Sequence, residues 1–346
     1  MPPARPTALL LVIPLCDPER AKAPTAIALG SFDGLHEGHR RVIAAVSERA
    51  RARGLVPTVV SFWPHPREVL FGETRLRLDL PAEKLHLLQP LGIEQLVLVP
   101  FTPQLAALSP QAFVEQVLVG QLQAQLVAVG ENFRFGAGRS GDTATLQRLG
   151  QAHGMEVLVQ SMLSDHQERF SSSRIRRALA AGDLAEAQRL LGRPYRFSGV
   201  VGTGKGLGRQ LGWPTANVQV DGRKCLPLEG VYAAWVELAG PAGAASPERL
   251  PAVMNLGPQP TVDPAAPSAV EVHLLDVQRQ LVGCEITVEP VALLRRQQRF
   301  EGLEQLVAQI GRDADQARQL LGSAAGVGVG EAPADEGGNG PQQQNP

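Results

Sequence analysis

Two histidines, His36 and His39, follow a glycine-containing turn near the start of the chain. The turn, from Gly30 to Gly34, comes directly after the apolar run 25–29, and an amphipathic segment begins near residue 40. This order predicts a strand, a tight turn and the first turn of a helix. Glycines let a phosphate approach the backbone closely, and the amides of a helix N-terminus favour its negative charge. The two imidazoles are therefore expected to lie beside the phosphates of a bound nucleotide.

The H-x-G-H pattern of this turn resembles the signature of nucleotidyltransferases, enzymes that attack the α-phosphate of a nucleotide. The alternative is a pair of surface histidines beside a turn, which the preceding strand and the following helix disfavour. Aspartate and aromatic side chains also belong to the turn. The positions expected to contact the nucleotide are Gly30, Phe32, Asp33, Gly34 and Gly38.

A second phosphate site is indicated by the run Arg169-Phe170-Ser171-Ser172-Ser173-Arg174-Ile175-Arg176, which opens a predicted helix. Hydroxyls at a helix N-terminus, flanked by guanidinium groups, form a clamp for anions. Taken alone, the run is better explained as a helix cap with solvated arginines. The presence of the histidine turn favours the anion clamp.

Two further segments place aromatic side chains at the ends of predicted strands. They are Ser61–Pro66 and Gly130–Gly136, and aromatic residues make up only 4% of the chain. A flat ring system of a ligand is able to stack on such side chains. For Phe62, Phe133 and Phe135 individually, packing in the core is the alternative and the simpler interpretation.

The second half of the chain contains a near-match to a phosphate-binding loop. The stretch Gly199–Lys205 meets the pattern G-x-x-x-x-G-K, but Gly206 then offers no hydroxyl for Mg²⁺, so we reject that assignment. The glycines continue (Gly204, Gly208 and Gly212) and lead into Pro214-Thr215-Ala216-Asn217. A glycine-rich flap followed by this element fits a bound nucleotide, with the oxygens of Thr215 and Asn217 facing its metal ion. The alternative is a turn capped by its own side chains.

Glu271 lies in the alternating segment Ala269–Leu274. A carboxylate on such a strand is able to take the proton of an attacking hydroxyl, although a single glutamate on a strand is more often a solvent-facing residue. From the residues alone, the second half is predicted to be a barrel that binds phosphate groups, and the molecule that accepts the phosphoryl group is not identified.

These motifs occur in two regions of the chain that differ in their predicted secondary structure. Between residues 25 and 190, apolar strand patterns alternate with helical ones, which predicts an α/β domain with a parallel sheet and ligands at the carboxyl ends of its strands. The expected strands are Ala26–Leu29, Val56–Phe62, Gln95–Pro100, Leu126–Val129 and Glu156–Val159, and the expected helices are Arg40–Arg53, Ala82–Gln89, Pro110–Gly120, Thr143–His153 and Leu184–Leu191.

Beyond residue 191 short β-rich runs are separated by Gly, Pro and Asp, and a helical period returns only at Phe300–Leu321. This texture predicts an antiparallel β-barrel with one terminal helix over 191–321. The expected strands are Phe197–Val201, Gly230–Glu237, Ala252–Asn255, Ala269–Leu275 and Glu285–Val291, with a hairpin excursion at Ala239–Arg249.

Bulk properties restrict the partners. The 346 residues carry a net charge of −1, so no basic excess is available for nucleic acid. The apolar run at 9–15 is too short to cross a membrane, and residues 1–24 are interpreted as a variable extension. Residues 322–346 are rich in Gly, Ala, Gln and Pro, which predicts a disordered tail. The cysteines (Cys16, Cys225 and Cys284) match no metal or disulfide pattern, as expected for thiols in the reducing cytosol, and self-association stays open.

Seven motifs occur in the order found in one family: Gly30–His39, Gly130–Gly136, Arg169–Arg176, Gly208–Asn217, Leu226–Tyr232, Met254–Thr261 and Glu271–Asp276. In this order the chain resembles the bacterial bifunctional riboflavin kinase/FAD synthetases from about residue 25 to residue 321. The resemblance implies an N-terminal, Rossmann-like FMN adenylyltransferase domain and a C-terminal riboflavin kinase barrel. ATP, riboflavin, FMN and FAD would be the substrates and products, and Mg²⁺ the cofactor.

The resemblance also implies roles for single residues. In the kinase domain, the glycine flap with Thr215 and Asn217 would bind ATP and Mg²⁺, and Glu271 would be the base that activates the ribityl 5′-hydroxyl of riboflavin. In the N-terminal domain the phosphate of FMN would attack the α-phosphate of a second ATP, whose triphosphate His36 and His39 would hold. The remaining positions that match the family's nucleotide and catalytic residues are Asn132, Arg169, Ser172, Ser173 and Arg176.

Three residues depart from the family pattern. Ser173 stands in place of threonine, Trp213 in place of a smaller aromatic residue and Val277 in place of phenylalanine. None removes a group that the chemistry requires. The alternatives are a chain in which one domain is inactive and a flavin-binding protein without turnover, and the retained His36, His39 and Glu271 speak against both.

Overall fold

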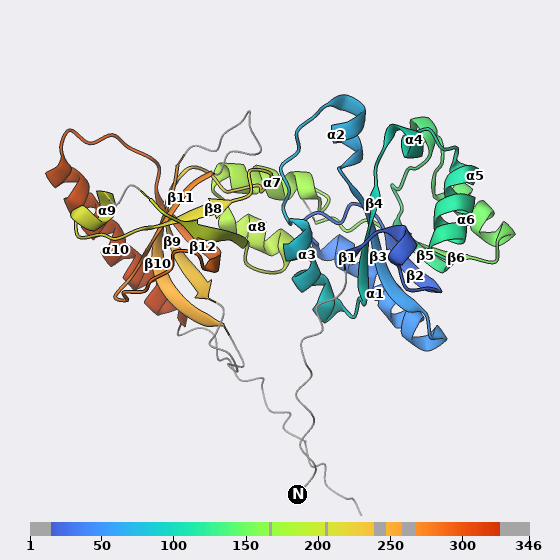
Figure 1. Ribbon diagram of the computed structural model, residues 1–346, viewed down its shortest axis with the longest axis horizontal. Coiled ribbons are helices and arrows are strands. Elements are labelled where there is room, and N and C mark those ends of the chain that lie inside the picture. Colours follow the sequence, from blue (N-terminus) through green and yellow to red (C-terminus); the bar gives the residue numbers. More distant parts are fainter. Residues whose placement is uncertain (1–14, 166–167, 205–206, 239–246, 258–267, 326–346) are drawn as a thin grey trace, which may run out of the picture.

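The computed structural model describes residues 15–165, 168–204, 207–238, 247–257 and 268–325, which form two domains in series (Figure 1). The first domain contains a parallel six-stranded sheet in the order β1-β4-β3-β2-β5-β6. Its strands are β1 (Leu15–Cys16), β2 (Thr25–Leu29), β3 (Val56–Trp63), β4 (Gln95–Pro100), β5 (Ala124–Gly130) and β6 (Glu156–Gln160).

Helices cover both faces of this sheet because its central strands are apolar on both sides. Ile27 and Leu29 of β2 pack into the core under α5 and α6, whereas Ala26 and Ala28 of the same strand pack under α1. The helices of this domain are α1 (Glu37–Arg53), α2 (Pro66–Phe71), α3 (Pro81–Leu88), α4 (Pro103–Ala106), α5 (Pro110–Phe113) with its π-helical continuation (Val114–Gln121), α6 (Thr143–Ala152), α7 (Ser172–Ala181) and α8 (Leu184–Leu191), with short 3-10 turns at Pro18–Arg20, Gln89–Leu91 and Ala137–Arg139.

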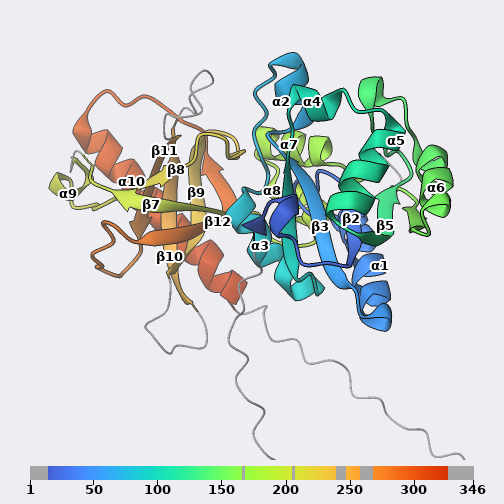
Figure 2. The same cartoon turned by 45° about the vertical axis from the view of Figure 1, so that its right-hand side comes forward.

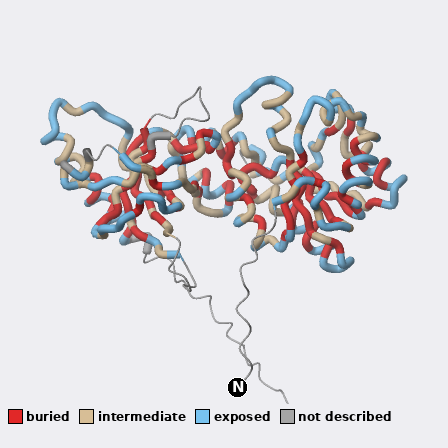
Figure 3. Tube along the Cα trace, viewed as in Figure 1, coloured by how far each residue is buried: buried red, intermediate tan, exposed pale blue. Residues whose placement is uncertain are grey.

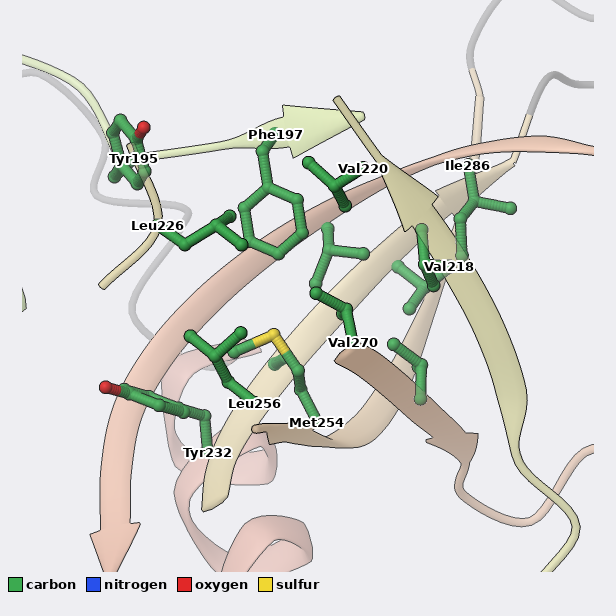
Figure 4. Close-up of a cluster of buried hydrophobic side chains, with 14 of the residues drawn as sticks. Tyr195, Phe197, Val218, Val220, Leu226, Tyr232, Met254, Leu256, Val270 and Ile286 are labelled. Carbon is green, nitrogen blue, oxygen red and sulfur yellow. The ribbon is translucent and has the colours of Figure 1, made fainter. Parts of the chain in front are cut away.

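The second domain is a closed antiparallel barrel in the order β10-β11-β8-β7-β12-β9. Alternate residues of each strand fill its interior, and Figure 4 shows Val270 among these buried side chains. Val272 belongs to the same core cluster, so Glu271 between the two valines points outward. The elements are β7 (Phe197–Gly202), α9 (Leu207–Gln210), β8 (Ala216–Val220), β9 (Gly230–Leu238), β10 (Glu248–Leu256), β11 (Ser268–Leu274), β12 (Glu285–Arg295) and α10 (Leu303–Ala325).

The predicted fold class is confirmed, and three details differ from the sequence-based expectation. The stretch after Pro214, one interpretation of which was a capped turn, continues as strand β8 and completes the barrel. Leu15–Cys16, within the expected N-terminal extension, pairs with β4 as the edge strand of the sheet. Helix α10 ends at Ala325, so the first residues of the expected tail are helical. The rest of that tail, residues 1–14 and most of the hairpin excursion (239–246) lie outside the described residues.

Helices α7 and α8 lie between the sheet and the barrel (Figure 2), and their apolar residues belong to the same core cluster as the barrel interior. Buried segments therefore occur in the sheet, in the barrel and in the chain between them (Figure 3). The three cysteines are free thiols. In the part of the chain that the structure describes, we find no helix with the length and apolar character of a membrane span.

A short segment of the first domain forms the other half of this junction. The amide of Arg77 donates to the carbonyl of Arg223 (2.6 Å), and the amide of Cys225 donates back to the carbonyl of Arg77 (2.7 Å). Between them Lys224, which has no exposed surface, donates its ammonium to Glu83 Oε2 and to the carbonyl of Leu78, each at 2.6 Å. The second domain is thus attached to the first through a buried ion pair.

Replacement of this lysine should destabilise the whole chain. Lys224→Ala leaves the Glu83 carboxylate without its buried partner, a change that costs about 3–5 kcal/mol, and we expect the thermal midpoint to fall by about 5 °C or more. Arg279→Ala removes an exposed pair with Glu248 and should shift the midpoint by no more than about 2 °C. Calorimetry on the two variants measures the difference; equal shifts would contradict a structural role for the buried pair.

Candidate active sites

A cavity of about 1080 Å³ opens at the carboxyl ends of the parallel strands. Parallel strands all end at the same edge of a sheet, so the segments that follow them converge there. The wall contains the turn after β2, the ends of β3, β5 and β6, and the N-terminus of α7. Of the predicted site residues it is lined by Gly30, Phe32, Asp33, His36, Gly38, His39, Asn132, Arg169, Ser172 and Ser173.

The two histidines are stacked at the start of α1. Their ring centroids are 3.7 Å apart with 20° between the planes, and the ring of Phe32 meets His39 edge-on at 5.3 Å. Burial lowers the pKa of His36 to about 4; burial, His36 and the nearby Lys84 lower that of His39 to well below its usual value. Both imidazoles are therefore neutral at neutral pH, and each still has one N–H to donate to a phosphate oxygen.

The Nδ1 atoms of both rings are buried and have no hydrogen-bond partner within the described ranges. A buried polar atom without a partner costs free energy, and in a native structure such an atom often marks a functional group. The two Nδ1 atoms are thus hydrogen-bonding groups that the described part of the protein does not use.

The carboxylate of Asp33 holds the turn rather than pointing free into the cavity. Asp33 is 4% exposed, and its Oδ1 accepts from the amides of Leu78 (2.9 Å) and Asp79 (3.2 Å), while its Oδ2 accepts from the guanidinium of Arg176. Gly34 has φ = +89°, and a Cβ there would lie 2.7 Å from a methyl of Leu78. Asp33, Gly34 and Arg176 therefore shape the turn that the histidines need.

The serine run begins α7 in the expected way. The Ser171 hydroxyl caps the helix by accepting from the amide of Arg174 (3.2 Å), and Ser172 donates to the carbonyl of Asp33 (2.8 Å). The Ser173 hydroxyl makes no hydrogen bond in the described structure, and the guanidinium of Arg169 contacts only the sulfur of Met162, at 3.9 Å. Ser173 and Arg169 are consequently available to an anion in the cavity, whereas Ser172 supports the turn.

Two basic side chains that line the cavity, Lys84 and Arg75, were not predicted from the sequence. Lys84, in the middle of α3, is buried and donates to the carbonyl of Ser31 (3.0 Å), and burial lowers its pKa. Arg75 is half-buried, and its side chain has no partner among the described residues; burial and Arg176 lower its pKa. No local motif marks either residue, because only the tertiary fold brings α3 and the segment before it to the histidines.

The aromatic residues at the strand ends serve the core as well as the cavity. Phe62 and Phe133 pack against the core cluster that contains Phe135, and Phe133 and Phe135 stack at 5.5 Å. The ring of Trp63 has the guanidinium groups of Arg77 and Arg223 at 5.1 Å each. Core packing thus accounts for the phenylalanines, although they also line the cavity.

The remaining predicted residues gather on the outer face of the barrel. Asn217 of β8 pairs in register with Glu271 of β11, which pairs in turn with Asn255 of β10. Because their neighbours Val218, Met254 and Val270 fill the barrel, all three polar side chains occupy one row on the outside. Asn255 was not predicted, and its alignment with Glu271 depends on strand register.

The glycine-rich segment lies against this row. A Cβ at Gly204 would lie 1.9 Å from Asn217 Nδ2, and one at Gly208 would lie 2.4 Å from the carbonyl of Trp213 and 3.1 Å from Thr215 Oγ1. Only glycine permits an approach this close. Gly212, with φ = +83°, makes the turn before Pro214, whose carbonyl accepts from His273 Nδ1 (2.8 Å).

The donor set here suits a hard cation that keeps water and phosphate ligands. Thr215 and Asn217 offer a hydroxyl and an amide oxygen, and Glu271 stands beside Asn217 in the row. Within the described residues no group of three or more His, Cys, Asp or Glu is placed to hold a metal on its own. Mg²⁺ would therefore depend on a nucleotide for part of its coordination.

Two of the departures from the family pattern have structural partners. Trp213 meets His273 edge-on at 5.1 Å and packs with the cluster that α10 forms on the barrel, around Val253 and Ala314. Val277 packs against the main core cluster of the barrel. Both residues are used for packing beside the barrel site.

Comparison with known proteins assigns each half of the chain to a family. Residues 19–174 match the FAD synthetase family, and residues 191–321 match the riboflavin kinase family. The chain is 41% identical over 298 residues to the bifunctional riboflavin kinase/FMN adenylyltransferase of Escherichia coli strain K12, covering 86% of this chain and 92% of that protein. It is 35% identical over 301 residues to the protein of the same name from Bacillus subtilis, with the same two coverages.

Among solved structures, the chain is similar to the crystal structure of a macrolide-efflux protein from Streptococcus pneumoniae. The TM-score is 0.76 at 27% sequence identity, and the match covers 89% of this chain and 99% of that one. The similarity therefore extends over both domains.

The buried histidine predicts how stability varies with pH. The folded-state pKa of His36 is about 4, below the value of about 6.5 for an unfolded chain, so the unfolded chain binds more protons between these values. Stability should thus fall as the pH drops from about 6.5 towards 4, by roughly 3 kcal/mol for this residue. In His36→Gln the thermal midpoint should decrease less between pH 7 and pH 5 than in the parent chain. The exposed His86 is the control: His86→Gln should leave the slope unchanged, and an unchanged slope in His36→Gln would refute the assignment.

Proposed function

The chain belongs to the family of bifunctional riboflavin kinase/FMN adenylyltransferases, and on that premise we propose how its two domains carry out the two reactions. Riboflavin kinase and FMN adenylyltransferase activities reside in one chain, which uses riboflavin, FMN and ATP as substrates. One observation carries the assignment of residues: each matched domain contains its own set of converging polar side chains, one at the edge of the sheet and one on the outside of the barrel.

The barrel is the site of riboflavin phosphorylation. The 5′-hydroxyl oxygen of riboflavin attacks the γ-phosphorus of ATP, the bond to the β-phosphate oxygen breaks, and ADP leaves. Glu271 takes the proton of the hydroxyl as the attack proceeds. The close approach of the glycine-rich segment to Asn217 and Thr215 leaves its backbone free to bind the phosphates. Thr215 and Asn217 would hold Mg²⁺ beside Glu271. Bound Mg²⁺ would neutralise charge on the phosphates.

The cavity of the first domain is the site of adenylyl transfer. An oxygen of the FMN phosphate attacks the α-phosphorus of ATP, and pyrophosphate leaves as the new phosphoanhydride bond forms. The nucleophile is already an anion, so no base is required, and the protein contributes position and charge stabilisation. His36 and His39 donate to the triphosphate, Arg169 and Ser173 bind the transferred or leaving phosphates, and Asn132 lines the same cavity.

Separate substitutions should separate the two activities. Glu271→Ala is expected to lower FMN formation from riboflavin by about 10²–10⁴-fold while FAD formation from supplied FMN continues. His36→Ala combined with His39→Ala should do the reverse, with a loss of about 10²-fold or more in FAD formation. Chromatography of flavins during incubation with ATP and Mg²⁺ measures both rates. A parallel loss of both activities in either variant would show that the domains are wrongly assigned.

Riboflavin phosphorylation should require Mg²⁺ bound beside Asn217 on the barrel. Removal of Mg²⁺ with EDTA should stop riboflavin phosphorylation, and Asn217→Ala should raise the Mg²⁺ concentration required for half-maximal kinase activity several-fold. Gln219→Ala, an exposed change on the same face of β8, is the matched control and should leave that concentration unchanged. If Asn217→Ala has the parent's Mg²⁺ requirement, Asn217 does not hold the metal.

A further inference from the structure

Gln297 is not among the predicted site residues, but its side chain reaches the row of Asn217, Glu271 and Asn255 on the outer face of the barrel. Gln297 lies in the connection between β12 and α10, and it is exposed. Its amide Nε2 donates to the backbone carbonyl of Leu256 (2.9 Å) and to Asn255 Oδ1 (2.7 Å). Asn255 Nδ2 in turn lies 3.5 Å from Glu271 Oε2, across the register pair of β10 and β11. Three side chains thus form a relay that ends on the carboxylate.

A backbone atom determines the direction of every hydrogen bond in this relay. The carbonyl of Leu256 is only able to accept, so the amide group of Gln297 that faces it must be the NH₂ group. The same NH₂ group faces Asn255, which must therefore present its oxygen to Gln297. The NH₂ group of Asn255 is consequently turned towards Glu271. Had Asn255 the opposite orientation, its oxygen would face the carboxylate and repel it.

The backbone segment that carries Gln297 is attached to helix α10 by an ion pair. Two residues earlier, Arg295 forms an ion pair with Asp313 of α10, with Nε 2.9 Å from Oδ2, and the side chain of Asp313 is only 4% exposed. The end of β12 and the start of the connection are thereby attached to the helix that packs on the barrel. Gln297 accordingly extends from an anchored backbone.

We propose that Gln297 is a positioning residue for riboflavin phosphorylation. It fixes the orientation of Asn255, so that Asn255 donates to one oxygen of Glu271 and holds the carboxylate in the rotamer that receives the substrate proton. This inference rests on the proposed role of Glu271 as the base. Because Gln297 acts through the side chain of Asn255, its loss should affect the rate of the chemical step and not the binding of substrates.

The test is a comparison of kcat and KM in the kinase reaction of the full chain. Gln297→Ala should lower kcat for FMN formation by about tenfold, a smaller loss than removal of a base, with KM for riboflavin and for ATP unchanged within about twofold. The neighbouring exposed Gln298, which makes no side-chain hydrogen bond in the described structure, supplies the control: Gln298→Ala should match the parent chain. A raised KM for riboflavin with kcat intact would mean that Gln297 binds substrate, and the proposal would be overturned.

A double-mutant cycle tests whether Gln297 acts through Asn255. Asn255→Leu should show the same change in kcat, and the combined variant should be no slower than Asn255→Leu alone, because both changes break one relay. Multiplied losses would show two independent effects and would overturn the relay. FAD formation from supplied FMN should be unaffected in all three variants, which verifies that the chain is folded.

The same experiment separates this inference from the assignment of the base. If Glu271→Ala abolishes FMN formation and Gln297→Ala leaves kcat unchanged, the relay fails while the proposed function stands. If Glu271→Ala retains kinase activity, the base itself is wrongly assigned, whatever the outcome for Gln297.

Discussion

The buried carboxylate of Asp33 is the contact on which the arrangement of both domains depends. It accepts from two amides of the segment at Leu78–Asp79 and from Arg176 of α7, so one side chain joins three elements. The first is the turn that carries the histidines, and the second is the segment whose Arg77 hydrogen-bonds to the barrel. A buried charge is tolerated only when it is paired in this way. Catalytic geometry in one domain and attachment of the other therefore share one constraint.

The two proposed sites would bind phosphate by different physical means. At the edge of the sheet, the strand ends and helix N-termini converge, and neutral histidines, held neutral by burial, supply hydrogen-bond donors without adding a full charge. On the barrel, the outward side chains of neighbouring strands form one polar row, and glycines allow the backbone to lie directly over it. The first arrangement suits a reaction between two anions. The second suits a hydroxyl that must lose a proton.

Patterns of short range were predictable because they depend on local geometry. The alternation of strand and helix, the H-x-G-H turn and the serine-capped helix of α7 each reflect neighbouring residues. Strand β8 was missed because its first residues, Ala216 and Asn217, belong to a motif that is equally typical of a turn. What makes it a strand is pairing with β7 and β11, which lie far away along the chain. Asp33 was predicted to contact nucleotide, and its further role in holding the turn was not predictable, because the amides that it binds lie 45 and 46 residues onward.

Residue type and spacing were enough to predict the class of each domain, and the order of the motifs was enough to identify the family and its two activities. Which side chains of the sites hydrogen-bond to the protein itself, and which do not, depends on the packing of distant segments. Ser172 supports a carbonyl while Ser173 faces the cavity, Lys84 and Arg75 join the histidines, and Asn255 with Gln297 reaches Glu271. These relations depend on strand register and on contacts between distant segments. No local pattern encodes them, because each is a property of two parts of the chain at once.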